Sequence, residues 1–582
     1  MIKIEHQPRL WFTSEDVERI KNLLAEEVPT AVALSELAME TASGSVDEWL
    51  AQATDASGSD KTKGDHVYDQ SLAMAYLLTG EQEYARKAYE FQRVFSRQPK
   101  ANLGRASQAY RLAIVHEACY GGWNDQQRRE MTGRLVELHR SFYDASRGGD
   151  PHNVTNNHWA VSHAGAAMAA MAAQGHPGPD GDPVDLSEGI AWAMGRMKAF
   201  CMHFGDAGIY HEGLGYMKYA TTFMIPALLA WRNFGGEDLL ATFPHLRDMP
   251  ASLYIPAAAR RAVPDVVGGE GNFAAELSWN DSGPSWGASS VIPLLFSIAP
   301  THQRGALRWM YDRLKGIHGD GSFTPQWGGW VMALFHYPFD AEPTPPDGVL
   351  PRHITDSRQG LGLLRNRYAD GNDTILGCYA KNTHIGGHVQ DDTGSVRFMS
   401  LGCDWIMGGG QARAAAEYQS VVIPADGSRD KNRLGAVVWD EASETGGVFG
   451  MDLRKSSVGY AERYLGIDWS DELPAEAAIA WLDNLDDHDG RDWLWNMTYQ
   501  PGLDFQTHDD GAGFTLRAEN GASLNARFLA AVPAEMRQLE TPVSARRFQS
   551  GAEVSYVPRP YVQAVFPAQK PLAIYVVLTV QN

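Results

Sequence analysis

The chain has 582 residues, of which 50 are Lys or Arg and 71 are Asp or Glu, so its formal charge at pH 7 is −21. Proteins that bind nucleic acids or anionic lipids gain affinity when Lys and Arg side chains replace counterions. A chain this acidic is therefore not expected to bind DNA, RNA or a membrane surface. Its composition, 44% hydrophobic and 21% charged, is typical of a folded globular protein.

The cysteines and the first residues exclude further classes. Cys119, Cys201, Cys378 and Cys403 are far apart and form no C-x-x-C pair, which excludes a zinc ribbon and a disulfide framework. The N-terminal residues lack the basic start and apolar run of a signal peptide, and no apolar stretch of about 18 residues follows. We therefore expect a cytoplasmic protein, or a periplasmic or secreted one whose signal has been removed.

Residues 1–340 have the hydrophobic spacing of helices. A capped helix begins near Ser14, and further helices are predicted over residues 68–78, 81–94, 105–119, 125–143, 158–173, 183–203, 212–234 and 304–314. Short turns such as Thr79-Gly80 separate neighbouring helices. A long series of helices with short connections predicts an α/α toroid.

A proline-rich stretch, residues 341–352, is predicted to be a linker to a second domain, because proline cannot continue a helix. Beyond it the apolar spacing changes to two. Strands are predicted over residues 374–380, 395–401, 436–439, 477–482, 493–499, 513–517, 524–531 and 572–580. Residues 353–582 are therefore predicted to form an antiparallel β-sandwich, with a separate small C-terminal β-subdomain as an alternative division. The acidic run at 482–492 is predicted to be a solvated loop, since its spacing does not match a calcium-binding loop.

Several common catalytic motifs are absent. The sequence contains no P-loop, no dinucleotide-binding glycine pattern after a strand, no G-x-S-x-G at a strand-to-helix elbow and no H-E-x-x-H. These absences argue against nucleotide, serine-hydrolase and zinc-protease chemistry.

Two polar clusters stand out in the helical part. The first is Asn156-Asn157-His158-Trp159, at the start of an Ala-rich helix, although Asn at a helix start is also common as an N-cap. The second runs from Tyr210 to Tyr219 and contains Glu212, two glycines and Tyr216. Tyrosines at helical spacing are core residues in most proteins, so this cluster also has a purely structural explanation.

A third cluster, residues 384–395, follows a predicted strand. It contains His384, His388 and Asp392 within a stretch that ends in Gly394-Ser395. A polar turn is the alternative to a site.

Together these features resemble the heparinase II/III-like polysaccharide lyases, a group that includes alginate lyases of the same architecture. The resemblance rests on the Asn-His-Trp helix start, the Glu-Gly-x-x-Tyr-x-x-Tyr segment, and the stretch from Asp356 to Arg365 after the linker. The segment from His388 to Ser395 is similar to the family's H-x-H-x-D-x-G-S-F. The resemblance implies a toroid followed by a β-sandwich, and cleavage of uronic-acid glycans by β-elimination.

The resemblance also implies the roles of individual residues. Asn157 matches the Asn that neutralises the substrate carboxylate, and His158 matches a neighbouring catalytic His. Tyr216 matches the catalytic Tyr, with Tyr219 as the alternative, and His388 matches the catalytic His of the β-domain. As substrate-binding residues we expect Trp159, Arg105, Tyr110, Tyr219, Glu212 and His384.

The family's zinc ligands are not present in this sequence. Gln390, Gly408 and Gly435 occupy the three matching positions, and an amide is a poor replacement for imidazole. We therefore expect no cofactor. As an alternative, His384, His388 and Asp392 could bind a metal in another register.

β-Elimination needs a group that stabilises charge on the substrate carboxylate, a base for the C5 proton and an acid for O4. Tyr216 could serve as both acid and base in a syn elimination, whereas His158 or His388 would be the base in an anti elimination. Because His388 belongs to the second domain and the other residues to the first, the site is expected in the cleft between them.

The expected function is that of a carbon–oxygen lyase acting on 4-linked uronic-acid oligosaccharides or polysaccharides. One alternative is a glycoside hydrolase with paired carboxylates, Glu212 with Glu270 or Asp281. Another is a non-catalytic glycan-binding protein. The net charge favours short acidic oligosaccharides over long polyanions, and the oligomeric state stays open, with a homodimer as one option.

Overall fold

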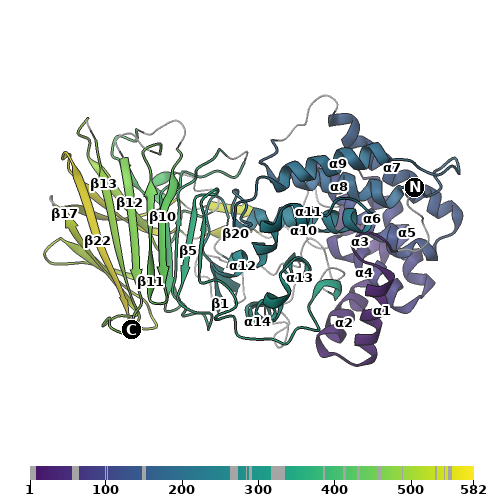
Figure 1. Cartoon of the computed structure of the whole chain (residues 1–582), viewed down its shortest axis with the longest axis horizontal. Helices are drawn as coiled ribbons and strands as arrows, with labels where there is room; N and C mark the ends of the chain where they lie inside the picture. The colour runs from purple at the N-terminus through teal and green to yellow at the C-terminus, as the bar shows by residue number, and fades with distance from the viewer. Residues whose placement is uncertain are drawn as a thin grey trace.

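The structure is a computed structural model with a helical part at one end and a β part at the other (Figure 1). It describes residues 8–54, 65–98, 100, 102–146, 153–261, 273–282, 285–286, 291–315, 334–384, 387–410, 415–428, 433–456, 460–487, 489–530, 534–542, 544–547, 553–556 and 558–582. In these ranges no helix combines the length and apolar composition needed to cross a membrane.

All the helices predicted from the sequence are present, with ends shifted by a few residues. The helices are α1 (Ser14–Ala25), α2 (Pro29–Ser43), α3 (Val46–Thr54), α4 (Asp65–Thr79), α5 (Gln82–Phe95), α6 (Asn102–Cys119), α7 (Asp125–Ser146), α8 (Asn157–Ala173), α9 (Ser187–Cys201), α10 (Leu214–Asn233), α11 (Leu239–Thr242), α12 (Met249–Tyr254), α13 (Val291–Phe296) and α14 (Arg304–Lys315). Short 3-10 helices cover Tyr120–Gly122, Pro244–Asp248, Thr301–Gln303 and Ala416–Tyr418.

Helix α8 lies at the centre of the helical part. Nearly all its residues are buried, and it packs against α6, α7, α9 and α10. A helix that is apolar on every side is stable only in such a position. The packing holds the N-terminus of α8, where Asn157 lies, in a defined place.

A small sheet interrupts the helical part. It contains β1 (Ala257–Arg261), β2 (Phe273–Glu276) and β3 (Ser285–Trp286), which pair antiparallel. The helical spacing of residues 1–340 did not predict these short strands.

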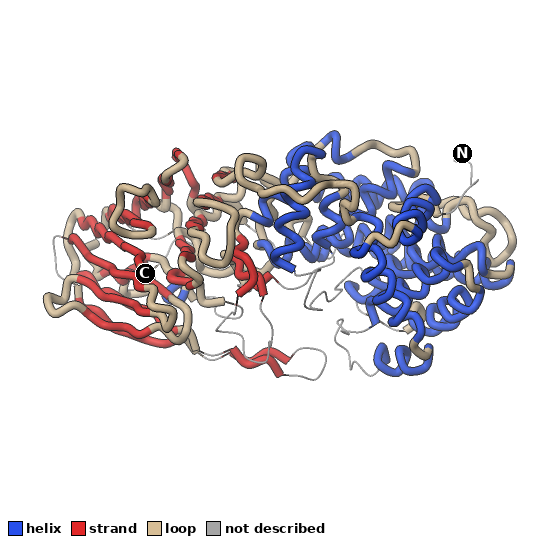
Figure 2. The backbone as a smooth tube through the Cα atoms, turned by 90° about the horizontal axis from the view of Figure 1, so that it is seen from below, coloured by secondary structure: helices blue, strands red, loops and turns tan. Residues whose placement is uncertain are grey.

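The β part contains two layers of strands that face each other across a common core. Five-stranded and four-stranded sheets lie on one side and an eight-stranded sheet on the other, in the orders β4-β5-β6-β7-β8, β18-β21-β14-β9 and β10-β11-β12-β13-β22-β17-β16-β15. Figure 2 shows these strands at the end of the molecule opposite the helices. The antiparallel β-sandwich predicted from the sequence is confirmed.

The strands of this part are β4 (His353–Asp356), β5 (Leu361–Arg365), β6 (Ile375–Tyr379), β7 (Ser395–Ser400), β8 (Cys403–Ile406), β9 (Val422–Pro424), β10 (Ala436–Ser443), β11 (Gly446–Asp452), β12 (Tyr460–Asp468), β13 (Ala477–Leu485), β14 (Trp493–Thr498), β15 (Asp504–Thr507), β16 (Gly513–Arg517), β17 (Ser523–Ala530), β18 (Glu535–Glu540), β19 (Ser544–Arg547), β20 (Glu553–Tyr556), β21 (Pro560–Phe566) and β22 (Leu572–Gln581). The eight predicted strands correspond to β6, β7, β10, β13, β14, β16, β17 and β22.

The structure also tests the predictions for the cysteines and for the acidic run. The four cysteines are buried and free, as predicted. The acidic run at 482–492 is not simply a solvated loop, because its first residues continue β13 and Asp483 is fully buried. The Arg463 guanidinium lies 2.6 Å from the Asp483 carboxylate, which explains how strand alternation can place this charge inside.

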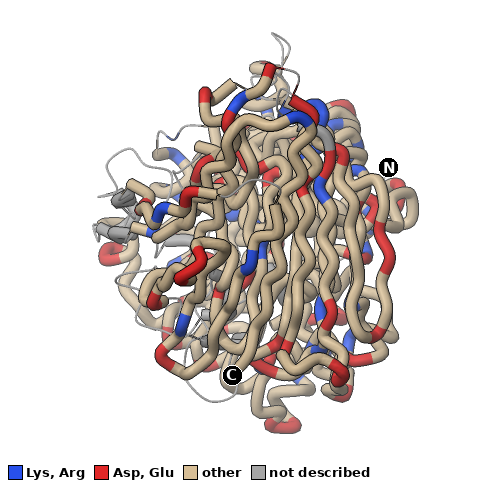
Figure 3. Tube along the Cα trace, turned by 90° about the vertical axis from the view of Figure 1, so that its left-hand side faces the viewer, with Lys and Arg blue, Asp and Glu red and all other residues tan. Residues whose placement is uncertain are grey.

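Figure 3 colours the Cα trace at the sandwich end of the molecule by residue type. Long stretches of the strands there contain neither acidic nor basic residues, and elsewhere Lys and Arg are scattered among Asp and Glu.

The helical part and the five-stranded sheet share a separate apolar core. Ile209, Ile255, Leu277 and Trp279 from the helical part pack with strand residues, namely Leu361, Leu363, Ile375, Tyr379 and Met399. This shared core fixes the relative positions of the two parts.

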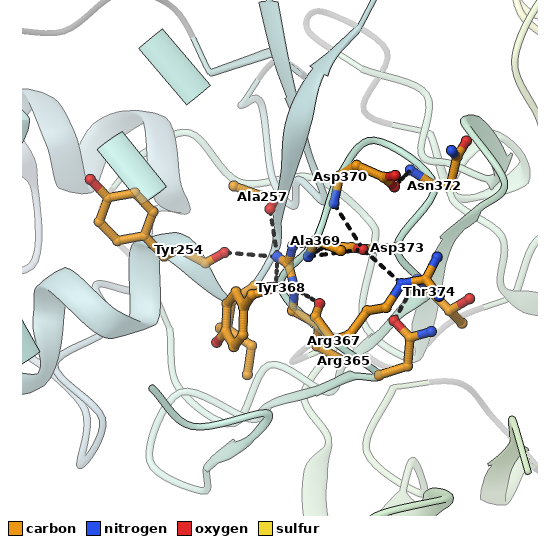
Figure 4. A network of polar contacts seen from close by, with 12 residues as sticks. Tyr254, Ala257, Arg365, Arg367, Tyr368, Ala369, Asp370, Asn372, Asp373 and Thr374 are labelled. Atoms are coloured by element: carbon orange, nitrogen blue, oxygen red, sulfur yellow. Dashed lines mark hydrogen bonds and ion pairs between the residues drawn. The ribbon is translucent and has the colours of Figure 1, made fainter. Parts of the chain in front are cut away.

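Arg365 of β5 fastens the same junction (Figure 4). Its Nη1 donates to the carbonyl oxygens of Tyr254 at 3.1 Å, Ile255 at 3.2 Å and Ala257 at 2.5 Å. Its Nη2 lies 2.5 Å from the buried carboxylate of Asp373. One guanidinium thus satisfies backbone acceptors of the helical part and a carboxylate of the sheet together.

Replacing Arg365 by Met should lower the free energy of unfolding by about 3–5 kcal/mol, because a buried carboxylate loses its buried cation and three carbonyl groups lose a donor. Arg367→Met is the matched control. Arg367 also contacts Asp373, at 3.2 Å, but its side chain is 45% exposed, so its loss should cost less than about 1 kcal/mol. Urea unfolding of the two variants measures the difference, and equal effects would contradict the role given to Arg365.

Candidate active site

Asn157 is the first residue of α8. Its neighbour Asn156 is the N-cap, whose side-chain oxygen accepts a hydrogen bond from the His158 backbone N–H at 2.8 Å. Because Asn156 supplies the cap, the Asn157 side chain is available for other contacts. The Asn157 backbone N and Nδ2 donate to Glu212 Oε2, at 3.0 and 2.7 Å.

Glu212 precedes α10 and is fully buried. Burial raises the pKa of the Glu212 carboxyl, while the hydrogen bonds from Asn157 and the proximity of His388 act in the opposite direction. The next residue, Gly213, has a φ of 93°, and a Cβ there would lie 2.8 Å from the Trp279 carbonyl oxygen. Glycine is therefore needed at the turn that brings both Glu212 and Tyr216 to the site.

Tyr216 and His388 meet from different parts of the chain. Tyr216 lies in the first turn of α10, and His388 lies in the connection between β6 and β7. Their rings are stacked, with centroids 3.4 Å apart and planes inclined by 20°. His388 Nδ1 also lies 3.0 Å from Asp281 Oδ2.

The loop that carries His388 lies against the start of α8. A Cβ at Gly387 would come within 2.6 Å of Asn156 Nδ2 and 3.1 Å of Glu212 Oε1. The close approach of this loop requires glycine at position 387. The structure thus brings Asn157, Tyr216 and His388 together, as expected for one site.

Two residues beside this site have an uncommon backbone conformation. Asn280 and His388 both have a φ of 55°. Left-handed conformations of residues other than glycine cost about 1–3 kcal/mol each and are concentrated at functional sites. At Asn280 the backbone N donates to Asp392 Oδ2 at 2.6 Å, and Nδ2 donates to the His211 carbonyl oxygen at 3.0 Å.

The groups that hold Asn280 are themselves buried. Burial raises the pKa of the Asp392 carboxyl, against the charges of Lys381 and Arg397. Burial also lowers the pKa of His211 to about 4. These groups form a framework behind the site, and the sequence motifs did not indicate Asn280 or the contact between Asp281 and His388.

The remaining expected residues differ in their surroundings. His158 is half-buried next to Asn157, and Tyr219 is half-buried on α10, with its ring packed edge-on against Phe223. Arg105 is half-buried on α6, and His384 is exposed.

Trp159 and Tyr110 are core residues. Trp159 donates from Nε1 to the Arg196 carbonyl oxygen at 3.0 Å, and its ring packs against His163. The Tyr110 ring packs against Phe223, and only 1% of the residue is exposed. Helix packing covers both rings, so neither has an open face for a sugar. The sequence did not predict this burial. Glu270, a partner considered for Glu212, lies outside the described residues.

The three positions of the family's zinc ligands do not fit a zinc ion. The Gln390 side chain donates to the Gly410 carbonyl oxygen at 2.9 Å and accepts from Gln419 at 2.7 Å. A Cβ at Gly408 would lie 2.3 Å from the Arg397 guanidinium, and Arg559 donates to the Gly408 carbonyl oxygen. Gly435 is surrounded by Leu453 and Thr393 side chains.

The charges in this region also disfavour a zinc ion. Burial lowers the pKa of Arg397 to about 10, and the nearby Arg559 adds to this effect. A divalent cation would add further positive charge beside two buried guanidinium groups. We therefore propose that the protein holds no zinc of the family type.

One other group of possible metal ligands occurs in the described ranges. Atoms of His116, Glu117 and His176 lie within 4.8 Å of one another, whereas His384, His388 and Asp392 form no such group. Arg9 already donates to both Glu117 oxygens, at 3.0 and 3.3 Å. The Glu117 charge is thus balanced by a guanidinium, which disfavours a cation here as well.

Comparisons with known proteins place the fold. No family model and no curated protein matches the chain. Heparinase III matches with a TM-score of 0.61 and 11% identity, over 90% of this chain and 78% of its own. A mutant of heparan sulfate lyase HepC from Pedobacter heparinus has a TM-score of 0.58 and 11% identity, over 98% of this chain and 93% of its own.

A third structure, the heparinase III–BT4657 gene product, has a TM-score of 0.58 and 11% identity, over 97% of this chain and 90% of its own. The chain therefore has the fold of the heparinase III type of polysaccharide lyase, helices followed by antiparallel sheets. The fold class and the resemblance found in the sequence are confirmed. At 11% identity the likeness concerns the fold, not the activity.

Metal analysis tests the zinc proposal. Protein purified without chelator should contain well below one zinc per chain, because amides and guanidinium groups occupy the family's zinc positions. One tightly bound zinc per chain would contradict this expectation. If it occurs, His176→Asn and His388→Asn, analysed side by side, would show whether the helical or the sandwich histidines hold the metal.

Proposed function

We propose that the protein is a lyase that cleaves 4-linked uronic-acid glycans by β-elimination and leaves a 4,5-unsaturated uronate at the new end. The observation that carries this proposal is the meeting of Asn157, Tyr216 and His388, from two parts of the chain, within a polysaccharide-lyase fold. These side chains supply the three kinds of group that the elimination needs.

Asn157 stabilises the charge that develops on the uronate carboxylate. The C5 proton is only weakly acidic while the adjacent carboxylate keeps its full charge. An amide nitrogen has two N–H groups, and Glu212 accepts one of those on Asn157 Nδ2. The second can donate to a substrate that displaces the cover over Asn157, a residue that is 1% exposed. The site lies at a helix N-terminus, whose dipole also favours negative charge.

Tyr216 and His388 move the protons. The Tyr216 hydroxyl donates to O4 of the leaving sugar, and the C5 proton passes to His388 or to Tyr216 itself. The 3.4 Å stack leaves no room for a sugar ring between the two side chains. They therefore act from the same face of the sugar, which favours syn elimination and leaves His158 as the base of the anti alternative.

The charge of the whole chain limits the substrate. A formal charge of −21 repels long polyanions at a distance, while a local group of donors can bind a few carboxylates. We therefore propose short acidic oligosaccharides as the preferred substrates.

Incubation with fragments of alginate, hyaluronan, chondroitin, heparan and ulvan should release a product with the ultraviolet absorbance of an unsaturated uronate. Tyr216→Phe should lower turnover by about 10²- to 10⁴-fold, because the phenol proton is lost, with an unchanged unfolding midpoint. Syn geometry also predicts faster cleavage at D-glucuronate or D-mannuronate, where the C5 proton and O4 share a face, than at L-iduronate or L-guluronate.

Different results would each contradict a part of the proposal. A folded protein that gives no unsaturated product with any fragment contradicts lyase activity. Unchanged turnover in Tyr216→Phe contradicts the role of the tyrosine, and a preference for L-iduronate or L-guluronate contradicts the syn geometry.

Glu212 distinguishes this lyase from a glycoside hydrolase. Both Asn157 contacts reach the same Glu212 oxygen, so the amide oxygen of a Gln can accept them. Glu212→Gln should therefore keep activity within about tenfold, whereas Glu212→Ala should lose about 10- to 100-fold because Asn157 loses its anchor. A hydrolytic carboxylate would behave differently, since Gln and Ala would both abolish turnover and the wild-type products would be saturated.

A further inference from the structure

We propose that Asp281 is a positioning residue for His388, holding the imidazole with its proton on Nδ1 and its lone pair on Nε2. This assignment rests on the lyase activity proposed above and makes Nε2 the nitrogen that accepts the C5 proton. The sequence alone indicates Asp281 only as a candidate hydrolase carboxylate.

Two contacts link the residues directly. Asp281 Oδ2 lies 3.0 Å from His388 Nδ1, and the Asp281 backbone N–H donates to the His388 carbonyl oxygen at 3.3 Å. A carboxylate can only accept from a neutral imidazole, so the proton between them lies on Nδ1. The backbone contact fixes the base of the side chain and the carboxylate fixes its ring.

The local backbone is arranged to form this pair. Asn280, directly before Asp281, and His388 itself both have left-handed conformations. Asn280 is held from two sides, by Asp392 of the sandwich and by the His211 carbonyl group of the helical part. These contacts place Asp281 next to His388, with Asn280 and His388 in left-handed conformations.

Stability alone does not explain the pair. The Asp281 and His388 side chains are 18% and 25% exposed, and partly exposed ion pairs contribute little to stability. The junction of the two parts is already held by an apolar core and by the buried Arg365. A contact that adds little stability there, between residues from two parts of the chain, is explained by a task at the site.

Titratable groups from both parts of the chain lie near His388. They include Asp281, the stacked Tyr216, and Glu212, which lies against the neighbouring Gly387. Because Tyr216 and Glu212 stay in place when Asp281 is changed, a substitution at Asp281 isolates its own effect.

The test compares Asp281→Asn with Asp391→Asn. Asp391 lies three residues after His388 and pairs with Arg433. Its variant therefore controls for the loss of a carboxylate close to His388 in the chain. An Asn at 281 can turn its NH₂ group toward Nδ1, which moves the imidazole proton to Nε2 and removes the base. We expect kcat of Asp281→Asn to fall by about 10²-fold or more, KM to change little, and Asp391→Asn to match the wild type.

The split between kcat and KM provides a readout that a structural role would not change. Loss of the base should lower kcat and leave KM close to the wild-type value, whereas a displaced site would change both. An unfolding midpoint within error of the wild type should accompany the loss of kcat. Wild-type kcat in Asp281→Asn would overturn the proposal.

A second measurement tests the proposal even when the variant does not fold or no lyase activity is found. Nitrogen NMR of the wild-type protein with labelled histidine, assigned by comparison with His388→Gln, reports which ring nitrogen of His388 carries the proton. A proton on Nδ1 supports the proposal, and a proton on Nε2 overturns it. Because this readout needs no turnover, failure of the lyase proposal and failure of the Asp281 proposal remain distinguishable.

Discussion

The site depends on a rigid junction between two parts of the chain with different architectures. Asn157 and Tyr216 belong to helices, whereas His388 belongs to a connection within the five-stranded sheet. Their geometry therefore depends on Arg365, whose guanidinium binds carbonyl groups of the helical part and the buried carboxylate of Asp373. The apolar core around Trp279 excludes water from the same junction. Together these contacts fix the position of the helical part relative to the five-stranded sheet.

Residues 279–281 connect this junction to the site. Trp279 packs in the shared core, Asn280 is hydrogen-bonded to both parts, and Asp281 binds His388. On the opposite side, the packing of α8 holds Asn157, and Glu212 joins it to the start of α10. Asn157 is thus held by the buried Glu212 and His388 by the partly exposed Asp281, so little reorganisation is needed when charge develops on a substrate.

Amide and guanidinium groups fill the positions that the resemblance matches to zinc ligands. Gln390 is hydrogen-bonded to Gln419, and the Arg397 and Arg559 guanidinium groups occupy the space beside Gly408 and Gly410. Such buried polar networks are stable only when nearly every donor and acceptor has a partner. The result is a sandwich whose loops are joined by amides and guanidinium groups.

Local sequence patterns were sufficient for most of the helices and for the alternating strands. The alternation in β13 is regular and was found, whereas β11, which contains three glycines, and the fully buried β5 carry no such signal. Long-range pairings are also missing from any local pattern. For this reason Asp483, whose partner Arg463 is 20 residues away, was assigned to a solvated loop, and Trp159 and Tyr110 were expected to contact sugar.

The sequence by itself determined the order of the two architectures and the residue types of the candidate site, because periodicity and motif spacing are local properties of the chain. Only the tertiary structure decided which of these residues meet. It placed Tyr216 on His388, gave Asp281 to that histidine, and enclosed Trp159 in the core. The two pairings with His388 join segments more than a hundred residues apart, and their distance is set by packing at the junction.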